Sequence, residues 1–150
     1  MSPQTQGILS SNGCVNEARV HRLSSFVVLF ISFSLYVYTL APTIIGGDSS
    51  AFCLSVHNLN LSFGSADDHP LYLFFGKLFS FLPFELSYSL NVMSAVFGSL
   101  TVFLVFLVIK HITRSNSAAF FGSFSLMVSH AFWLHCVIAE VYTLHTFFLA

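Results

Sequence analysis

Charged residues are scarce in this sequence, since only 7% of its 150 residues are Asp, Glu, Lys or Arg. An average soluble domain carries roughly 25%, and a fold of this length could not cover its surface with so few ionic groups. Hydrophobic residues make up 55% of the chain, and its 19 phenylalanines would promote aggregation on a surface exposed to water. The composition therefore excludes an ordinary soluble domain and indicates an integral membrane protein.

The sequence also lacks an excess of charge of either sign, because five basic and six acidic residues leave a net charge of -1. It has no basic patch of the kind that binds phosphate backbones, and we expect no nucleic acid among its partners. Cysteine is sparse as well. Cys14, Cys53 and Cys136 show no paired metal-ligand spacing, so we expect them to act as small apolar residues.

Three long segments carry no formal charge at all, and each is 24 or 25 residues long. About 20 apolar residues are enough for a helix to cross the hydrocarbon core of a bilayer. We therefore predict transmembrane spans near residues 25–45, 90–109 and 117–137, and the start of a fourth at residue 141. The first run is longer than the apolar region of a signal peptide, so we expect it to be retained. The predicted fold class is all-α, a polytopic transmembrane helix bundle.

Basic residues indicate the orientation, because Lys and Arg near the ends of spans stay on the cytoplasmic side. Arg19 and Arg22 precede the first span, while Lys110 and Arg114 separate the second from the third. The first and second spans both lie between these two pairs, so the alternation of spans places both pairs on one side. The sequence thus predicts a disordered cytoplasmic tail at residues 1–24 and places most acidic residues on the opposite face.

The segment 46–88 between the first two spans is the predicted external loop. From Ala51 to Phe63 apolar residues recur every three or four positions, which is typical of an amphipathic helix lying on the membrane surface. A second short interfacial or re-entrant helix is predicted at residues 71–82, after Pro70. Loops of this length that hold their own helices are usually functional. The polar face of the first loop helix comprises Ser49, Ser55, His57, Asn58 and Ser62.

Two acidic residues adjoin predicted spans on the external face. Asp48 follows the first span, and it is either the N-cap of the next helix, which the residue type alone favours, or a general base at the membrane surface. Glu140 lies at the edge of the membrane after the third span, where a carboxylate is costly and indicates function. His135 and His145 lie five residues on either side of Glu140. Helical spacing does not put these three on one face, so no metal site is predicted there.

A second polar cluster in the external loop consists of Asp67, Asp68 and His69. Carboxylate and imidazole groups can bind Mg²⁺ or Mn²⁺, but three adjacent residues rarely all reach one ion. A solvated turn, in which Asp68 or His69 caps the helix at Pro70, is an equally good interpretation. Lys77 could attract a phosphate group, although a lysine whose amine reaches the membrane interface is the more common case.

Four blocks of sequence occur in a distinctive order within residues 25–150. They are the segment 40–49 with Gly-Gly-Asp48-Ser, the segment 69–79 beginning His69-Pro, the segment 91–101 beginning Asn91-Val-Met, and Ala139-Glu-Val-Tyr-Thr-Leu-His145. This order resembles the amino-terminal part of a GT-C type membrane glycosyltransferase family, a domain of unknown function similar to the protein O-mannosyltransferases. We therefore expect residues 25–150 to be the opening part of a GT-C-like transmembrane domain in a longer protein; a nonfunctional gene remnant is the alternative.

The resemblance implies an enzyme that transfers a sugar from a polyprenyl-phosphate donor to a hydroxyl of a protein or glycan acceptor, with inversion, on the external or lumenal face. Asp48 occupies the position of the catalytic base in such enzymes, and Glu140 is the second candidate catalytic residue, which would orient acceptor or donor. A divalent cation, Mg²⁺ or Mn²⁺, is the candidate cofactor. The candidate substrate-binding residues are Asp67, Asp68, His69 and Lys77.

The chain departs from the family pattern at two places. Related proteins often carry an acidic residue three places after the aspartate, where this chain has Ala51, and a His-Pro-Pro-Gly-Tyr-Pro turn, where it has the segment 65–70. An alternative function is a transporter or lipid flippase component with an acidic external site, since acidic residues in membranes also mark ion pathways. The composition fits both a bacterial inner membrane and an endoplasmic reticulum, and we expect the former.

Overall fold

A computed structural model describes residues 23–46, 48–58 and 69–150 of the chain. Within these ranges every regular element is a helix, as the all-α prediction requires. In chain order the helices are Leu23–Tyr38, α2 (Ser49–Asn58), α3 (Pro70–Phe79), α4 (Leu86–Thr113), α5 (Asn116–Met127), α6 (His130–Val137) and α7 (Tyr142–Leu149).

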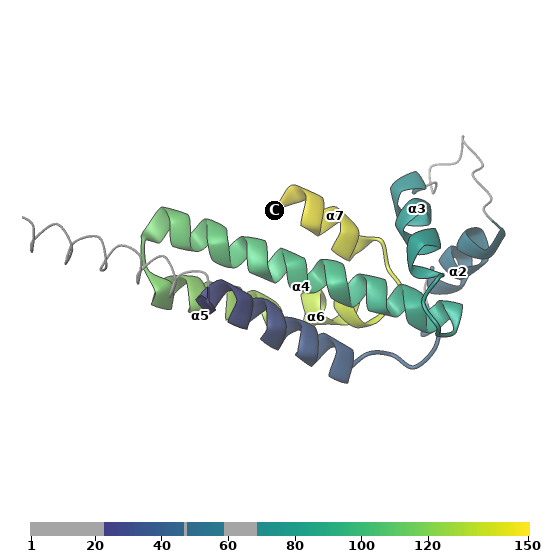
Figure 1. The fold of residues 1–150 in the computed structure, drawn as a ribbon, viewed down its shortest axis with the longest axis horizontal. Coiled ribbons are helices and arrows are strands. Elements are labelled where there is room, and N and C mark those ends of the chain that lie inside the picture. Colours follow the sequence, from purple (N-terminus) through teal and green to yellow (C-terminus); the bar gives the residue numbers. More distant parts are fainter. Residues whose placement is uncertain (1–22, 47, 59–68) are drawn as a thin grey trace, which may run out of the picture.

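Helix α4 is the central element, because side chains on two of its sides are buried against different neighbours. One side packs with the helix Leu23–Tyr38, α5 and α6 through Ala95, Val102 and Phe106. The other side packs with α2, α3 and α7 through residues that include Leu90 and Met93. Figure 1 shows this arrangement, with α2 and α3 gathered at the end where α4 begins.

Helix α4 contains the whole of the predicted span 90–109 and extends beyond it by one turn at each end. Its 28 residues have a mean hydropathy of 2.6 in the most apolar window. A helix of that length rises about 42 Å, which exceeds the roughly 30 Å of a hydrocarbon core. Among the described helices, α4 alone is long and apolar enough by itself to cross a membrane.

The first helix ends at Tyr38, seven residues before the predicted end of the span 25–45. Pro42 explains the early end, because proline supplies no backbone N–H and disfavours helical geometry at the residue before it. Gly46 then adopts a φ of 57°, which glycine reaches without strain, where the chain turns toward α2. Residues 1–22, which hold most of the predicted cytoplasmic tail, lie outside the described part of the chain.

The segment predicted as one span at 117–137 is divided into α5 and α6, which are bent by 64°. The break leaves the carbonyl oxygen of Met127 free, and the hydroxyl of Tyr36 donates a hydrogen bond to it at 3.1 Å. Counting this bent pair as one span, the described residues hold two candidate crossings by length and composition. A multi-pass topology with a fourth span therefore stays a prediction, although α7 begins within one residue of the predicted start at 141.

Both helices predicted in the segment 46–88 are present. Helix α3 begins at Pro70 and ends at Phe79, three residues before its predicted end. Helix α2 begins two residues before its predicted start, and the remainder of the predicted helix, beyond Asn58, lies outside the described residues. The predicted loop ends early, because α4 already begins at Leu86.

Small residues allow close helix packing at the centre of the fold. Gly98 of α4 lies so close to Cys136 of α6 that a Cβ atom at Gly98 would overlap with the Cys136 sulfur. Cys136 is fully buried and forms no disulfide. This confirms that Cys136 acts as a small apolar residue.

Candidate functional site

Asp48 occupies the start of α2. Its carbonyl oxygen accepts a hydrogen bond from the backbone N–H of Phe52 at 2.9 Å, which is the first bond of the helix, so Asp48 stands at the N-cap position. Its side chain is exposed. An exposed carboxylate at this position remains accessible to an approaching molecule, and the N-cap position is therefore compatible with a chemical role.

The next residue, Ser49, connects this segment to the carboxyl-terminal part of the chain. Its hydroxyl donates a hydrogen bond to the carbonyl oxygen of Ala139 at 2.8 Å, and only 1% of the Ser49 surface is exposed. The sequence assigned Ser49 to the polar, outward face of its helix, and the structure corrects this assignment. The hydroxyl is buried because it satisfies a backbone carbonyl that has left the helical ladder at the end of α6.

Glu140 follows Ala139 in the connection between α6 and α7, with 8% of its surface exposed. Its backbone N–H donates to the hydroxyl of Ser94 on α4 at 3.5 Å. Burial raises the pKa of the Glu140 carboxyl above its usual 4.5, the charge of Asp48 raises it further, and His135 opposes the rise. The structure therefore brings Asp48 and Glu140 into one electrostatic environment, with Asp48 exposed and Glu140 buried.

The segment that precedes Asp48 is also held by hydrogen bonds. The side-chain amide of Asn91 on α4 donates to the carbonyl oxygen of Ala41 at 2.8 Å and to that of Thr43 at 3.4 Å. The backbone N–H of Ala41 donates to the carbonyl oxygen of Val137 at 3.0 Å. Because this segment is not helical, its backbone groups need such external partners. Sequence reasoning did not find Asn91 as a site residue, since a buried amide in an apolar helix has no local signal for its partner.

Two buried polar atoms near Glu140 have no hydrogen-bond partner among the described residues. They are the hydroxyl of Tyr72 on α3 and the Nδ1 atom of His135 on α6. Burial raises the pKa of Tyr72, and the charges of Cys53 and Glu140 add to that effect, so the phenol lies within electrostatic reach of Glu140. Since buried polar groups are nearly always hydrogen-bonded, these two atoms give the surroundings of Glu140 an unused capacity to bind a polar group.

The predicted substrate-binding residues are only partly brought together. His69 occupies the N-cap position of α3 without a side-chain cap, and its ring centroid lies 5.6 Å from that of His145 on α7. Lys77 is half-buried in the last turn of α3, about 12 Å further along the helix. Asp67 and Asp68 lie outside the described residues. The contact between His69 and His145 joins two of the four sequence blocks. The spacing of residues along the sequence could not have predicted this contact, because the two histidines belong to different helices.

The described residues hold no group of three or more His, Cys, Asp or Glu side chains that could bind a metal ion. The predicted divalent cation stays a prediction, and no step proposed below passes through it.

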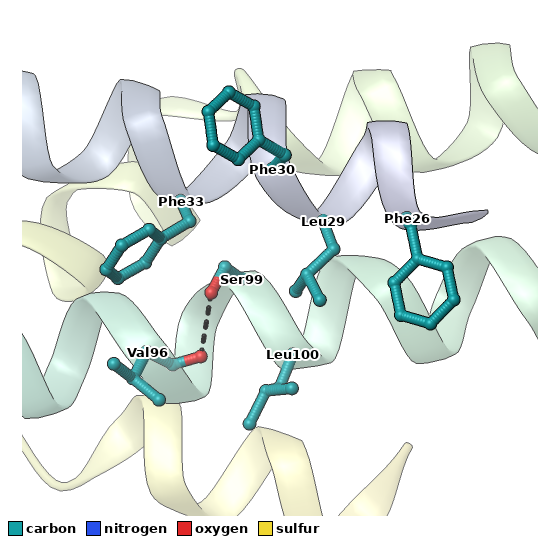
Figure 2. A pocket seen from close by; sticks show the side chains of 7 residues that line it. All are labelled: Phe26, Leu29, Phe30, Phe33, Val96, Ser99 and Leu100. Atoms are coloured by element: carbon teal, nitrogen blue, oxygen red, sulfur yellow. Dashed lines mark hydrogen bonds between the residues drawn. The ribbon is translucent and has the colours of Figure 1, made fainter. Parts of the chain in front are cut away.

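An apolar groove of about 460 Å³ lies between the helix Leu23–Tyr38 and α4 (Figure 2). Ser99 supplies a hydroxyl to the lining, but that hydroxyl donates to the carbonyl oxygen of Val96 in its own helix at 2.8 Å. No titratable side chain lines the groove, so it is separate from the site of Asp48 and Glu140. The lining residues are Phe26, Leu29, Phe30, Phe33, Val96, Ser99 and Leu100.

The sequence of this chain matches a known protein family. Residues 48–150 match the family described as Protein O-mannosyl-transferase TMEM260 N-terminal domain. One relative, the protein O-mannosyl-transferase TMEM260 of Mus musculus, is 24% identical over 130 residues, which cover 85% of this chain and 18% of the relative. No solved structure matches the chain. The matched range contains Asp48, Ser49, Asn91 and Glu140, and the resemblance predicted from the four sequence blocks is confirmed: the chain belongs to the TMEM260 N-terminal domain family of protein O-mannosyl-transferases.

Proposed function

We propose that this chain is the amino-terminal part of a membrane-embedded glycosyltransferase that moves a sugar from a polyprenyl-phosphate donor to an acceptor hydroxyl. The name of the mouse relative describes transfer of mannose to a protein through oxygen. Mannose is therefore the proposed sugar, and a protein hydroxyl is the proposed acceptor. Because the chain spans only 18% of that relative, the complete activity is assigned to the longer protein rather than to these 150 residues.

The observation that carries this proposal is the hydrogen bond from Ser49 to Ala139, which brings the positions of Asp48 and Glu140 together. In the proposed reaction the acceptor oxygen attacks the anomeric carbon of the sugar. The bond from that carbon to the phosphate oxygen breaks, and the polyprenyl phosphate leaves with the bonding electron pair. Asp48, whose carboxylate is exposed, takes the proton of the acceptor hydroxyl as the general base. A single displacement of this kind inverts the configuration at the anomeric carbon.

Glu140 has a different proposed role because its environment differs. Its raised pKa favours the protonated carboxyl, which can donate a hydrogen bond to an oxygen of the sugar or of the acceptor. In many enzymes, two carboxyl groups in different surroundings have different pKa values and therefore take different catalytic roles. Glu140 is therefore proposed to orient the substrate, together with the unpartnered atoms of Tyr72 and His135.

The charge distribution along α4 supports a site on the non-cytoplasmic side. Ser94, which contacts Glu140, lies in the first third of the helix, and Lys110 and Arg114 lie at its other end. From Ser94 to Lys110 the helix rises about 24 Å, a large part of the bilayer core. Because basic residues stay cytoplasmic, the end that carries Asp48 and Glu140 faces outward in this proposal, and the amino terminus is cytoplasmic. The predicted bacterial host membrane stays a prediction.

The decisive test is Asp48→Asn in the full-length protein, reconstituted in lipid with a polyprenyl-phosphate mannose donor. Loss of a general base is expected to lower the transfer rate by about 10² to 10⁴-fold, while binding of the donor changes little. Glu85→Gln is the matched control, because Glu85 is another exposed acid, beside the start of α4, and should transfer normally. The anomeric configuration of the product, measured by NMR, should be inverted.

Normal transfer by Asp48→Asn would exclude Asp48 as the base. A wild-type protein that catalyses ion-dependent flux without sugar transfer would instead favour the transporter interpretation and overturn the proposed function.

A further inference from the structure

The backbone around Asp48 and the backbone around Glu140 are joined at one buried point. Ser49 and Ala139 are each 1% exposed, and the hydroxyl of Ser49 donates to the carbonyl oxygen of Ala139 at 2.8 Å. Each of these residues directly adjoins one of the two acids. Asp48 itself is exposed at the N-cap position of α2, so its own side chain is not what holds the two segments together.

We propose that Ser49 is a positioning residue, whose buried hydrogen bond to Ala139 fixes the spacing between the carboxyl groups of Asp48 and Glu140. This inference rests on the two-carboxylate site of the proposed function and adds a residue that acts without touching the substrate. The other hydrogen bonds at this end hold Ala41 and Thr43, several residues before Asp48. Between them and Asp48 lies Gly46 with its left-handed φ of 57°, a flexible residue type. Within the described part of the chain, the backbone of Asp48 is bonded only within its own helix, to the N–H of Phe52. Among the described hydrogen bonds that link this segment to another part of the chain, the bond of Ser49 is therefore the closest to Asp48.

The spacing has a measurable consequence, because two like charges disfavour each other's ionised form. Asp48 contributes to the raised pKa of Glu140, second to burial. A looser connection between the two segments would let Asp48 move away and would lower the pKa of Glu140. The titration of Glu140 therefore reports the spacing directly, whether or not the protein transfers sugar.

The groups near Glu140 come from several packed elements. Asp48 comes from the segment before α2, the phenol of Tyr72 from α3, and the imidazole of His135 from α6. Helix α4 contributes the hydroxyl of Ser94, which does not titrate. His145 of α7 is exposed, and its ring packs against His69. Of these groups, Asp48 is the one whose position Ser49 controls.

The test is an infrared titration of the full-length protein in lipid, in which the carboxyl band of Glu140 is assigned by its loss in Glu140→Gln. In Ser49→Ala the titration midpoint of Glu140 is expected to fall, because the like charge of Asp48 is no longer held nearby. Asp48→Asn is expected to lower the midpoint at least as much. In the double variant Ser49→Ala/Asp48→Asn, the midpoint should equal that of Asp48→Asn, because Ser49 acts through Asp48.

Ser50→Ala is the matched control, since Ser50 is the adjacent serine and its side chain is exposed; its midpoint should equal that of the wild type. If Ser49→Ala does not fold, Ser49→Cys has a side chain of similar size and a weaker donor, and its midpoint should fall by a smaller amount. An unchanged midpoint in the folded Ser49 variant would overturn the inference. The inference would also be overturned if Ser49→Ala lowered the Glu140 midpoint by the same amount in the Asp48→Asn protein as in the wild type.

Sugar transfer separates this inference from the proposed function. If the proposed function holds, Ser49→Ala should lower kcat with little change in the KM for the donor. The protonated form of Glu140 is the active one in that proposal, so the alkaline limb of the pH–rate profile should move with the infrared midpoint of Glu140. If the wild type transfers no sugar, the proposed function fails. The spacing inference is then still decided by the infrared midpoints alone.

Discussion

The hydroxyl of Tyr36 donates a hydrogen bond to the carbonyl oxygen of Met127, 91 residues further along the chain and 3.1 Å away. Tyr36 is fully buried, and Met127 is the last residue of α5. The bond therefore occupies a carbonyl that the break between α5 and α6 would otherwise leave without a donor. A tyrosine on the first helix thus compensates for a bend in a much later segment.

Tyr36→Phe is expected to lower the free energy of unfolding by about 1 kcal/mol, with more lost if the Met127 carbonyl stays unpaired. Tyr38→Phe is the matched control, because Tyr38 lies on the same helix and is 89% exposed; it should change stability by less than about 0.5 kcal/mol. Thermal or denaturant unfolding in one detergent measures both. Equal stabilities for the two variants would contradict the role of Tyr36.

Gly98→Ala is expected to destabilise the protein by about 1 to 3 kcal/mol, since the added methyl group would overlap with the sulfur of Cys136. The second substitution Cys136→Ala removes that sulfur and should recover part of the loss. The measurement is a double-mutant cycle of unfolding free energies, with Cys136→Ala alone as the reference. Strictly additive effects of the two substitutions would show that α4 and α6 do not approach each other here.

Glu140 makes stability depend on pH, and the direction follows from its raised pKa. In the range above the usual value of 4.5 the folded protein still holds the Glu140 proton while the unfolded chain has released it. The contribution of Glu140 to the stability of the folded protein is thus complete at low pH. It is lost as the pH rises through the pKa that Glu140 has in the folded protein. Glu140→Gln should remove this loss, so its melting temperature should fall less than that of the wild type as pH is raised. A melting temperature with the same pH slope in both proteins would contradict the buried position.

The sequence predicted α4 well, because a helix with no formal charge over more than twenty residues needs no partner to be recognised. It did not predict the bend between α5 and α6. The two residues at the bend are Val128 and Ser129, so neither is a proline or a glycine that would signal a break. The hydrogen bond that accommodates the bend comes from Tyr36, far away in the sequence. A local pattern cannot report a partner of that kind.

The sequence could indicate candidate site residues only where the signal lies in the residue and its immediate neighbours. Asp48 and Glu140 were noticed because carboxylates at the ends of apolar runs are conspicuous, and the structure brings their segments together. The residue type alone favoured an N-cap for Asp48, and only the family resemblance implied its role as the base. Ser49 was assigned to the wrong face, because helical periodicity sorts residues by polarity alone. It cannot show that the hydroxyl is buried by a hydrogen bond to a distant backbone carbonyl. Asn91 stands within one of the four sequence blocks, but its hydrogen bonds to Ala41 and Thr43 could not be predicted without the fold.

The bond between Ser49 and Ala139 joins residues 90 positions apart, which sets an order for biosynthesis. At roughly 5 to 20 residues per second, a ribosome needs about 5 to 18 seconds to synthesise the intervening chain. During that interval Asp48 has already been made, while the carbonyl that anchors its helix has not. A nascent chain stalled before Ala139 would therefore reach the translocon with its amino-terminal helices made and its acidic pair unassembled.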